Sequence, residues 1–152
     1  MQIAFFICRI LYNSTSNETI SADTTGENKG WQYIVLTHQS ASGKTAFYVN
    51  GKLTGVLNES IDFKEFVLGG TGEAKMIPSP TEAGYKNLLF YRSALNPDEV
   101  QALHYDQLLQ SSLEIYAPLN DKGFKPGTTA TNYAQSHSKL LIDGNIQTSA
   151  TR

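Results

Sequence analysis

The sequence predicts an all-β protein: a jelly-roll β-sandwich of two antiparallel sheets, with one short helix near residues 97–109. Three observations predict this class. Short runs of β-branched and aromatic residues recur along the chain, separated by Gly, Pro, Asn and Ser, as is typical of sandwiches and barrels. Eight Tyr, seven Phe and twelve Gly suit strands and tight turns. An Asn-Gly dipeptide stands between two of the runs, which is the strongest short-range signal for a β-hairpin.

The first predicted strands lie on either side of a long polar stretch. Residues 2–12 are apolar enough to form a strand, and residues 13–30 predict a loop with a short strand around 18–21. Residues 31–38 are nearly continuous in apolar and β-branched side chains. Such a run indicates a strand that is covered on both faces.

The hairpin is predicted at Asn50-Gly51, between strands over 45–49 and 52–56. A type I′ turn needs positive φ at both central residues, which Asn and Gly tolerate. The turn then sets the opposed pairs: Tyr48 with Leu53, and Val49 with Lys52. We favour the face of Tyr48 and Leu53 as the inward one. Both faces mix apolar and polar residues, so the pattern does not settle which face is inward.

The second half of the chain predicts strands over 63–68, 85–91 and 113–119, with a Gly/Pro/Ser-rich loop at 71–84. Only residues 139–143 suggest a strand after that.

The helix has a clear start. Asn96 suits the N-cap position, Pro97 suits the first helical position, and Glu99 completes a capping box. Apolar residues near one face extend the predicted helix to residue 109.

Composition excludes several classes of protein. The formal net charge is −2, and no basic block offers a footprint for nucleic acid. No apolar run approaches the roughly 18–20 residues that span a bilayer, so we expect no membrane insertion. The single cysteine, Cys8, permits no intrachain disulfide and is interpreted as a small buried hydrophobe.

Four segments in this order carry a resemblance to a known family: GWQYIVLTHQ (30–39), GKTAFYVNGKLTG (43–55), FVLGG (66–70) and NLLFYRSALNPDEVQAL (87–103). Together they resemble the concanavalin A-like lectin/glucanase superfamily, in its laminin G-like (pentraxin-like) branch. The resemblance implies a laminin G-like jelly roll over residues 1–119, shortened at its N-terminus. Residues 120–152 match no part of it. We expect them to form an extension that packs on the sandwich or leads to another domain.

The resemblance also implies a function. It predicts a non-catalytic carbohydrate-binding or adhesion-type module of a larger, secreted or cell-surface bacterial protein, located outside the cell, in the periplasm or on the cell surface. Its expected partners are a polysaccharide or glycan and the neighbouring domains. Two alternatives stay open: a glycoside hydrolase of the same superfold, and a structural or docking domain without a ligand of its own.

Sugar-binding sites use exposed aromatic rings, which makes the tyrosines candidates. Tyr33, Tyr48 and Tyr91 are the predicted carbohydrate-binding residues, and Tyr85 is a fourth candidate. The alternative for each is packing in the core with a tethered hydroxyl.

No residue is predicted to be catalytic. The acids Glu59, Asp62 and Glu65 alternate faces if they lie on one strand. Glu59 and Glu65 share a face but would be roughly 20 Å apart at ~3.3 Å per residue. A retaining hydrolase needs carboxyl groups about 5–5.5 Å apart.

No cofactor is expected, and metal ligands are not defined by any linear motif. The three histidines are scattered, which argues against zinc. Calcium stays open because it needs several oxygen ligands, and four acids fall in or near predicted loops: Asp23, Glu27, Asp62 and Glu73.

Overall fold

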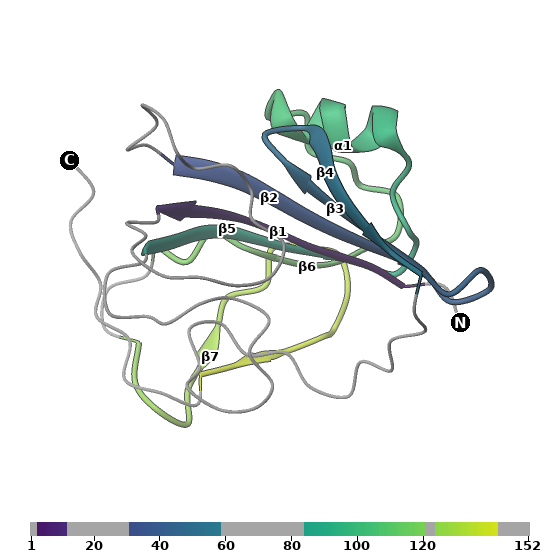
Figure 1. Cartoon of the computed structure of the whole chain (residues 1–152). Coiled ribbons are helices and arrows are strands. Elements are labelled where there is room, and N and C mark those ends of the chain that lie inside the picture. Colours follow the sequence, from purple (N-terminus) through teal and green to yellow (C-terminus); the bar gives the residue numbers. More distant parts are fainter. Residues whose placement is uncertain (1–2, 12–30, 59–83, 121–123, 143–152) are drawn as a thin grey trace.

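The computed structural model describes residues 3–11, 31–58, 84–120 and 124–142. Within these ranges the protein is an antiparallel β structure with one short helix, α1 (Pro97–His104), as predicted (Figure 1). Six strands form one sheet in the order β4-β3-β2-β1-β5-β6, and two short strands form a separate pair. The strands are β1 (Ile3–Leu11), β2 (Trp31–Gln39), β3 (Lys44–Val49), β4 (Lys52–Leu57), β5 (Gly84–Tyr91), β6 (Leu113–Ala117), β7 (Thr129–Ala130) and β8 (Leu140–Leu141).

Both faces of the six-stranded sheet are covered. Helix α1 lies over one face, and the segment that carries β7 and β8 lies beneath the other (Figure 1). Since successive side chains of a strand point to opposite faces, Tyr33 and Val35 of β2 pack on the helix side, and Leu36 packs on the other side. This explains the continuous apolar run that predicted a strand covered on both faces.

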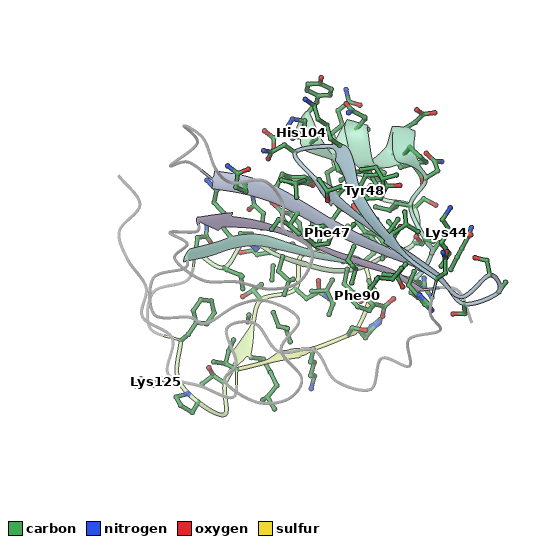
Figure 2. The ribbon with its side chains drawn as sticks, in the orientation of Figure 1. Lys44, Phe47, Tyr48, Phe90, His104 and Lys125 are labelled. Atoms are coloured by element: carbon green, nitrogen blue, oxygen red, sulfur yellow. The ribbon has the colours of Figure 1, made fainter. Side chains whose placement is uncertain are left out.

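Two clusters of buried side chains result. The helix-side core consists of Tyr33, Val35, Ala46, Tyr48, Leu89, Tyr91, Leu95, Val100, Leu103 and Leu113. The opposite core consists of Leu36, Leu88, Ala117, Ala130 and Ile142, with partly buried neighbours that include Phe47 and Phe90. Figure 2 shows Tyr48 toward the helix, and Phe90 on the lower side of the sheet.

The predicted hairpin is confirmed. Tyr48 pairs with Leu53 and Val49 with Lys52. Asn50 and Gly51 have φ of 50° and 78°, as a type I′ turn requires. Tyr48 is buried on the helix side, so the favoured inward face is correct for β3. It is wrong for β4, because Leu53 is 56% exposed. Phe47 packs into the opposite core, so β3 is covered on both faces.

The helix begins as predicted but ends earlier. Asn96 caps it, and the capping box with Glu99 is complete: Asn96 N donates to Glu99 Oε2 at 2.8 Å, and Glu99 N donates to Asn96 Oδ1 at 3.0 Å. Asp106 takes a φ of 60°, and the amides of Asp106 and Gln107 donate to Leu103 O and Ala102 O. This is a Schellman ending, in which a left-handed residue closes the helix. The prediction to residue 109 was wrong because the apolar pattern continues past this turn.

The C-terminal part differs from prediction in two ways. The strand expected at 139–143 is shorter, Leu140–Leu141, and it pairs with Thr129–Ala130, which was not predicted. The strand at 113–119 ends at Ala117. The predicted strands at 18–21 and 63–68 lie outside the described residues.

Candidate functional site

The three tyrosines predicted to bind carbohydrate are in the helix-side core. Tyr33, Tyr48 and Tyr91 are 5%, 6% and 0% exposed. The alternative stated for each, packing in the core, is therefore what the structure shows, because each side chain alternates onto the face that α1 covers. A covered ring has no face to offer a sugar, so these residues are not carried forward as candidates. The side chain of Tyr85 lies outside the description.

Tyr91 instead has a structural role. Its hydroxyl donates to the Leu109 carbonyl at 3.0 Å and so ties the loop after α1 to β5. Burial, with a smaller contribution from the charge of Glu99, raises the pKa of the Tyr91 phenol well above its ordinary value of 10.0. Burial also raises the pKa of the Tyr48 phenol. Both phenols stay protonated in the folded protein at neutral pH.

Tyr91→Phe should lower the free energy of unfolding by about 1 kcal/mol at pH 7, because the Leu109 carbonyl loses its donor. A folded-state pKa above 10 means that the folded protein holds its proton when the unfolded chain releases it. Stability is therefore full below pH 10 and falls as the pH rises further. Urea titrations from pH 8 to pH 11 should show a smaller alkaline fall for the variant. An equal fall in both proteins would contradict this assignment.

An exposed aromatic residue does occur where α1 ends. Tyr105 is 69% exposed and follows directly on the helix. Its ring lies next to that of His104, the last residue of α1. His104 and Gln101 lie against the β3–β4 turn, where Asn50 bonds to Gln32 of β2. We call these residues the helix–hairpin surface: Gln32, Asn50, Gln101, His104 and Tyr105.

Asn50 fixes the hairpin end of this surface. Its backbone amide donates to Tyr33 O at 2.7 Å, and its Oδ1 accepts from Tyr33 N at 2.9 Å. Its Nδ2 donates to Gln32 Oε1 at 2.6 Å. The turn residue is thus tied to the start of β2 by three hydrogen bonds, and the Gln32 carboxamide is oriented by one of them.

Helix α1 is seated directly on the hairpin turn. Gln101 Nε2 donates to Gly51 O at 3.2 Å. A Cβ at Gly51 would lie 3.0 Å from Gln101 Nε2 and 3.3 Å from His104 Cβ, so a larger residue would have to push these side chains aside, and the φ of 78° also favours glycine. The close contact brings His104 over the turn, where Figure 2 places it at the end of the helix.

Aromatic rings connect the core to the exposed end of the surface. The centroids of the Tyr33 and His104 rings are 6.0 Å apart, and those of His104 and Tyr105 are 5.3 Å apart. The interplanar angles are 52° and 47°. Because Tyr33 is buried and His104 half-buried, the exposed ring of Tyr105 rests on a supported base.

The chemistry of this surface suits a neutral, hydroxyl-rich ligand. Its groups are three carboxamides, an imidazole and a phenol, which donate and accept hydrogen bonds. A tyrosine ring gives a rigid apolar face of large area at low entropic cost. The surface has no carboxylate or ammonium group of its own, and Lys52 and Asp106 flank it with opposite charges.

Sequence reasoning missed Tyr105 because it was counted inside the predicted helix. The exposure depends on the chain turning at Asp106, a left-handed position occupied by a residue other than glycine. Asp tolerates that conformation, but its presence alone does not predict it.

Two of the described acids have structural partners. Glu99 serves the helix cap and Glu114 is paired with Arg92. Within the ranges that the structure covers, no group of three or more His, Cys, Asp or Glu is arranged to hold a metal ion. His38 is buried and shares a hydrogen bond of 2.8 Å with Thr45 Oγ1. The acids considered for hydrolysis and for calcium lie outside the described residues.

In the same ranges, no helix has the length and apolar character to cross a membrane.

Comparison with known proteins adds little. No protein-family model matches the chain, and no curated protein matches it. One solved structure that resembles it is a protein from Bacteroides ovatus proposed to bind carbohydrate, 17% identical, with a TM-score of 0.46. The likeness covers 74% of this chain and 38% of that protein, so this chain spans well under half of its length. A likeness of this size identifies no family.

Proposed function

We propose that this chain is a non-catalytic carbohydrate-binding module, and that it binds its ligand at the helix–hairpin surface. The observation that carries the proposal is the Tyr105 ring, 69% exposed on a base fixed by His104 and the hairpin. An exposed tyrosine ring can stack on a pyranose face, and neighbouring carboxamides can bond to the hydroxyls of the sugar.

We further propose that the fold is a concanavalin A-like jelly roll of the laminin G-like branch, in a secreted or cell-surface protein. The six-stranded antiparallel sheet would be one of its two layers. Support comes from the order of the elements and from the confirmed hairpin and helix start within the segments that carry the resemblance.

Tyr105→Ala should weaken binding about tenfold or more to any polysaccharide that the unaltered protein binds, because an aromatic contact of about 1.5 kcal/mol corresponds to that factor. Electrophoresis in native gels containing one of four neutral polysaccharides, mixed-linkage β-glucan, xylan, galactomannan or starch, measures it as a change in mobility. Tyr105→Phe keeps the ring and should keep most of the binding.

Leu108→Ala is the matched control, because Leu108 is also an exposed apolar residue close after α1. It should leave retention unchanged. If the unaltered protein is retarded by none of the four gels, the proposal fails. Equal weakening by the Tyr105 and Leu108 substitutions would remove the site assignment.

A second candidate function is a docking domain, and it rests on β4. Among the strands that the structure describes, β4 lies at the edge of the sheet, and it exposes three apolar side chains: Leu53 at 56%, Val56 at 39% and Leu57 at 40%. Unprotected edge strands can pair with another chain. Pull-down by a neighbouring domain of the parent protein, lost on Val56→Lys, would favour this function over sugar binding.

A further inference from the structure

A second exposed aromatic residue lies at the opposite edge of the sheet. Tyr133 is 60% exposed, and its ring centroid is 6.2 Å from that of Tyr116 on β6, at 56°. Tyr116 packs against the helix-side core, so the pair lies toward the side of the sheet that carries α1. Tyr133 belongs to the C-terminal segment, which the family resemblance does not cover.

The backbone beside Tyr133 is hydrogen-bonded to β6. Tyr133 N donates to Tyr116 O at 2.8 Å, and Tyr116 N donates to Asn132 Oδ1 at 2.9 Å. Asn132 Nδ2 donates in turn to Glu114 O at 3.0 Å. The side chain of Asn132 thereby continues the hydrogen-bond ladder of β6 and covers a sheet edge that would otherwise be open.

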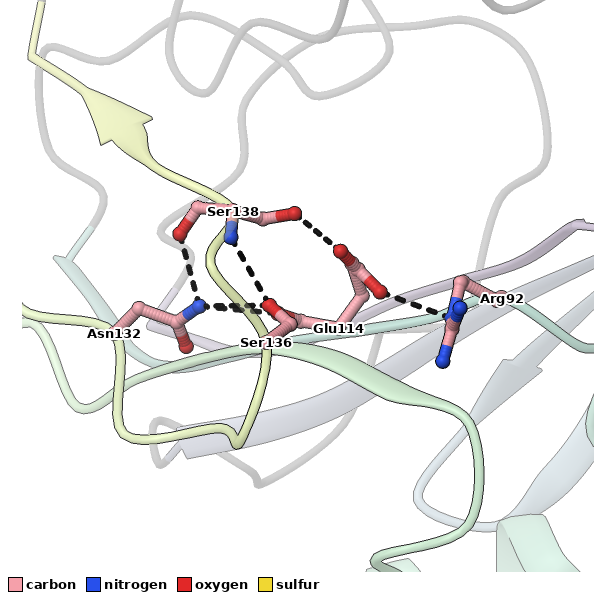
Figure 3. Close-up of polar contacts among 5 residues, drawn as sticks. All are labelled: Arg92, Glu114, Asn132, Ser136 and Ser138. Atoms are coloured by element: carbon pink, nitrogen blue, oxygen red, sulfur yellow. Dashed lines mark hydrogen bonds and ion pairs between the residues drawn. The ribbon is translucent and has the colours of Figure 1, made fainter.

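A polar network anchors the same segment (Figure 3). Glu114 Oε2 is 2.9 Å from Arg92 Nε, and its Oε1 accepts from Ser138 Oγ. Ser136 Oγ donates to the Glu114 carbonyl. These contacts fix the backbone that carries Tyr133, so a ligand that binds the ring has little loop entropy to remove.

The loop from α1 to β6 connects the two aromatic positions. It starts at Tyr105 and reaches β6 at Leu113, and Tyr91 holds it through Leu109 O. Its exposed residues include two carboxamides, Gln107 and Gln110. The distance across the sheet from β3 to β6 is four strand spacings, roughly 19 Å at ~4.8 Å each.

We infer that Tyr133 and Tyr116 form a second sugar contact, so that the ligand is an extended polysaccharide chain rather than a terminal sugar or short oligosaccharide. The inference rests on the proposed function and extends it to the length of the ligand. One chain engages Tyr105 at one end and Tyr133 at the other, with the amides of the loop between them. Two contacts on one chain multiply affinity, because the second forms at high effective concentration.

Chain length separates this inference from the function on which it rests. The retained polysaccharide is cut by partial hydrolysis into size-graded fractions, and Kd is measured for each by calorimetry. The unaltered protein should bind fractions long enough to span both contacts roughly a hundredfold more tightly than disaccharides and trisaccharides. Tyr133→Ala should remove this gain for long fractions, whereas Tyr105→Ala should weaken binding of fractions of every length.

Leu141→Ala is the control, because Leu141 is exposed to a similar extent, 63%, in the same segment. It should retain the full length dependence, and thermal melting confirms that both variants fold. Binding of the unaltered protein without length dependence overturns this inference alone, as does an unchanged length dependence in Tyr133→Ala. Failure of the unaltered protein to bind any polysaccharide overturns the proposed function and this inference together.

Discussion

Asn132→Ala is expected to lower the free energy of unfolding by about 3 kcal/mol. The substitution removes the acceptor of Tyr116 N and Ala134 N and the donor to the carbonyls of Glu114 and Ser138. Each half-buried group left without a partner costs roughly 1–3 kcal/mol, and water reaches some of them and reduces the sum. Urea denaturation followed by circular dichroism measures the change.

Two further substitutions show whether the side-chain amide of Asn132 is responsible for the loss of stability. Asn132→Asp keeps the acceptor oxygen but replaces the donor with a carboxylate that faces the carbonyls of Glu114 and Ser138, so it should destabilise the protein by a comparable amount. Gln135→Ala, at an exposed neighbour, should change stability by no more than about 0.5 kcal/mol. A loss below 1 kcal/mol for Asn132→Ala would mean that the C-terminal segment does not depend on this side chain.

This network could not be predicted from the sequence, and the reason is physical. The turn at Asn50-Gly51 and the helix start at Asn96 are local, since each depends on residues within four positions. Asn132 acts on Glu114 and Tyr116, which lie 18 and 16 positions earlier along the chain. The residues from 131 to 138 have no apolar alternation that would predict a strand. Side-chain amides and hydroxyls hold them in place, rather than the backbone hydrogen bonds of a regular strand pair.

The same distinction governs the candidate site. The aromatic residues at strand positions were identifiable, but which ring remained exposed depended on what covered each face. The helix covers Tyr33, Tyr48 and Tyr91. Tyr105 is exposed where the helix ends, five residues before the end that the apolar pattern predicted. Local sequence signals therefore predicted the strands, the hairpin turn and the helix start. Which side chains are accessible to a ligand depends on packing between segments that are distant in the sequence.

Asn50→Ala should cost about 3 kcal/mol in the free energy of unfolding and should also weaken polysaccharide binding. Alanine at a φ of 50° is strained by roughly 1–2 kcal/mol. The substitution also removes the acceptor for Tyr33 N and the donor to Gln32 Oε1, worth about 1 kcal/mol each. Asn50→Gly relieves the backbone strain and loses only the two side-chain bonds, so it should be about 1 kcal/mol more stable than Asn50→Ala.

Asn87→Ala is the matched control, because Asn87 also has a positive φ, 56°, but lies on β5, three strands from β3. It should show the backbone strain and leave gel retention unchanged. Both Asn50 variants, by contrast, should bind more weakly at temperatures where they are folded, since each frees the Gln32 carboxamide that Asn50 orients. If Asn50→Gly binds as tightly as the unaltered protein, Gln32 and Asn50 do not belong to the ligand surface, which would then be confined to the aromatic end at Tyr105.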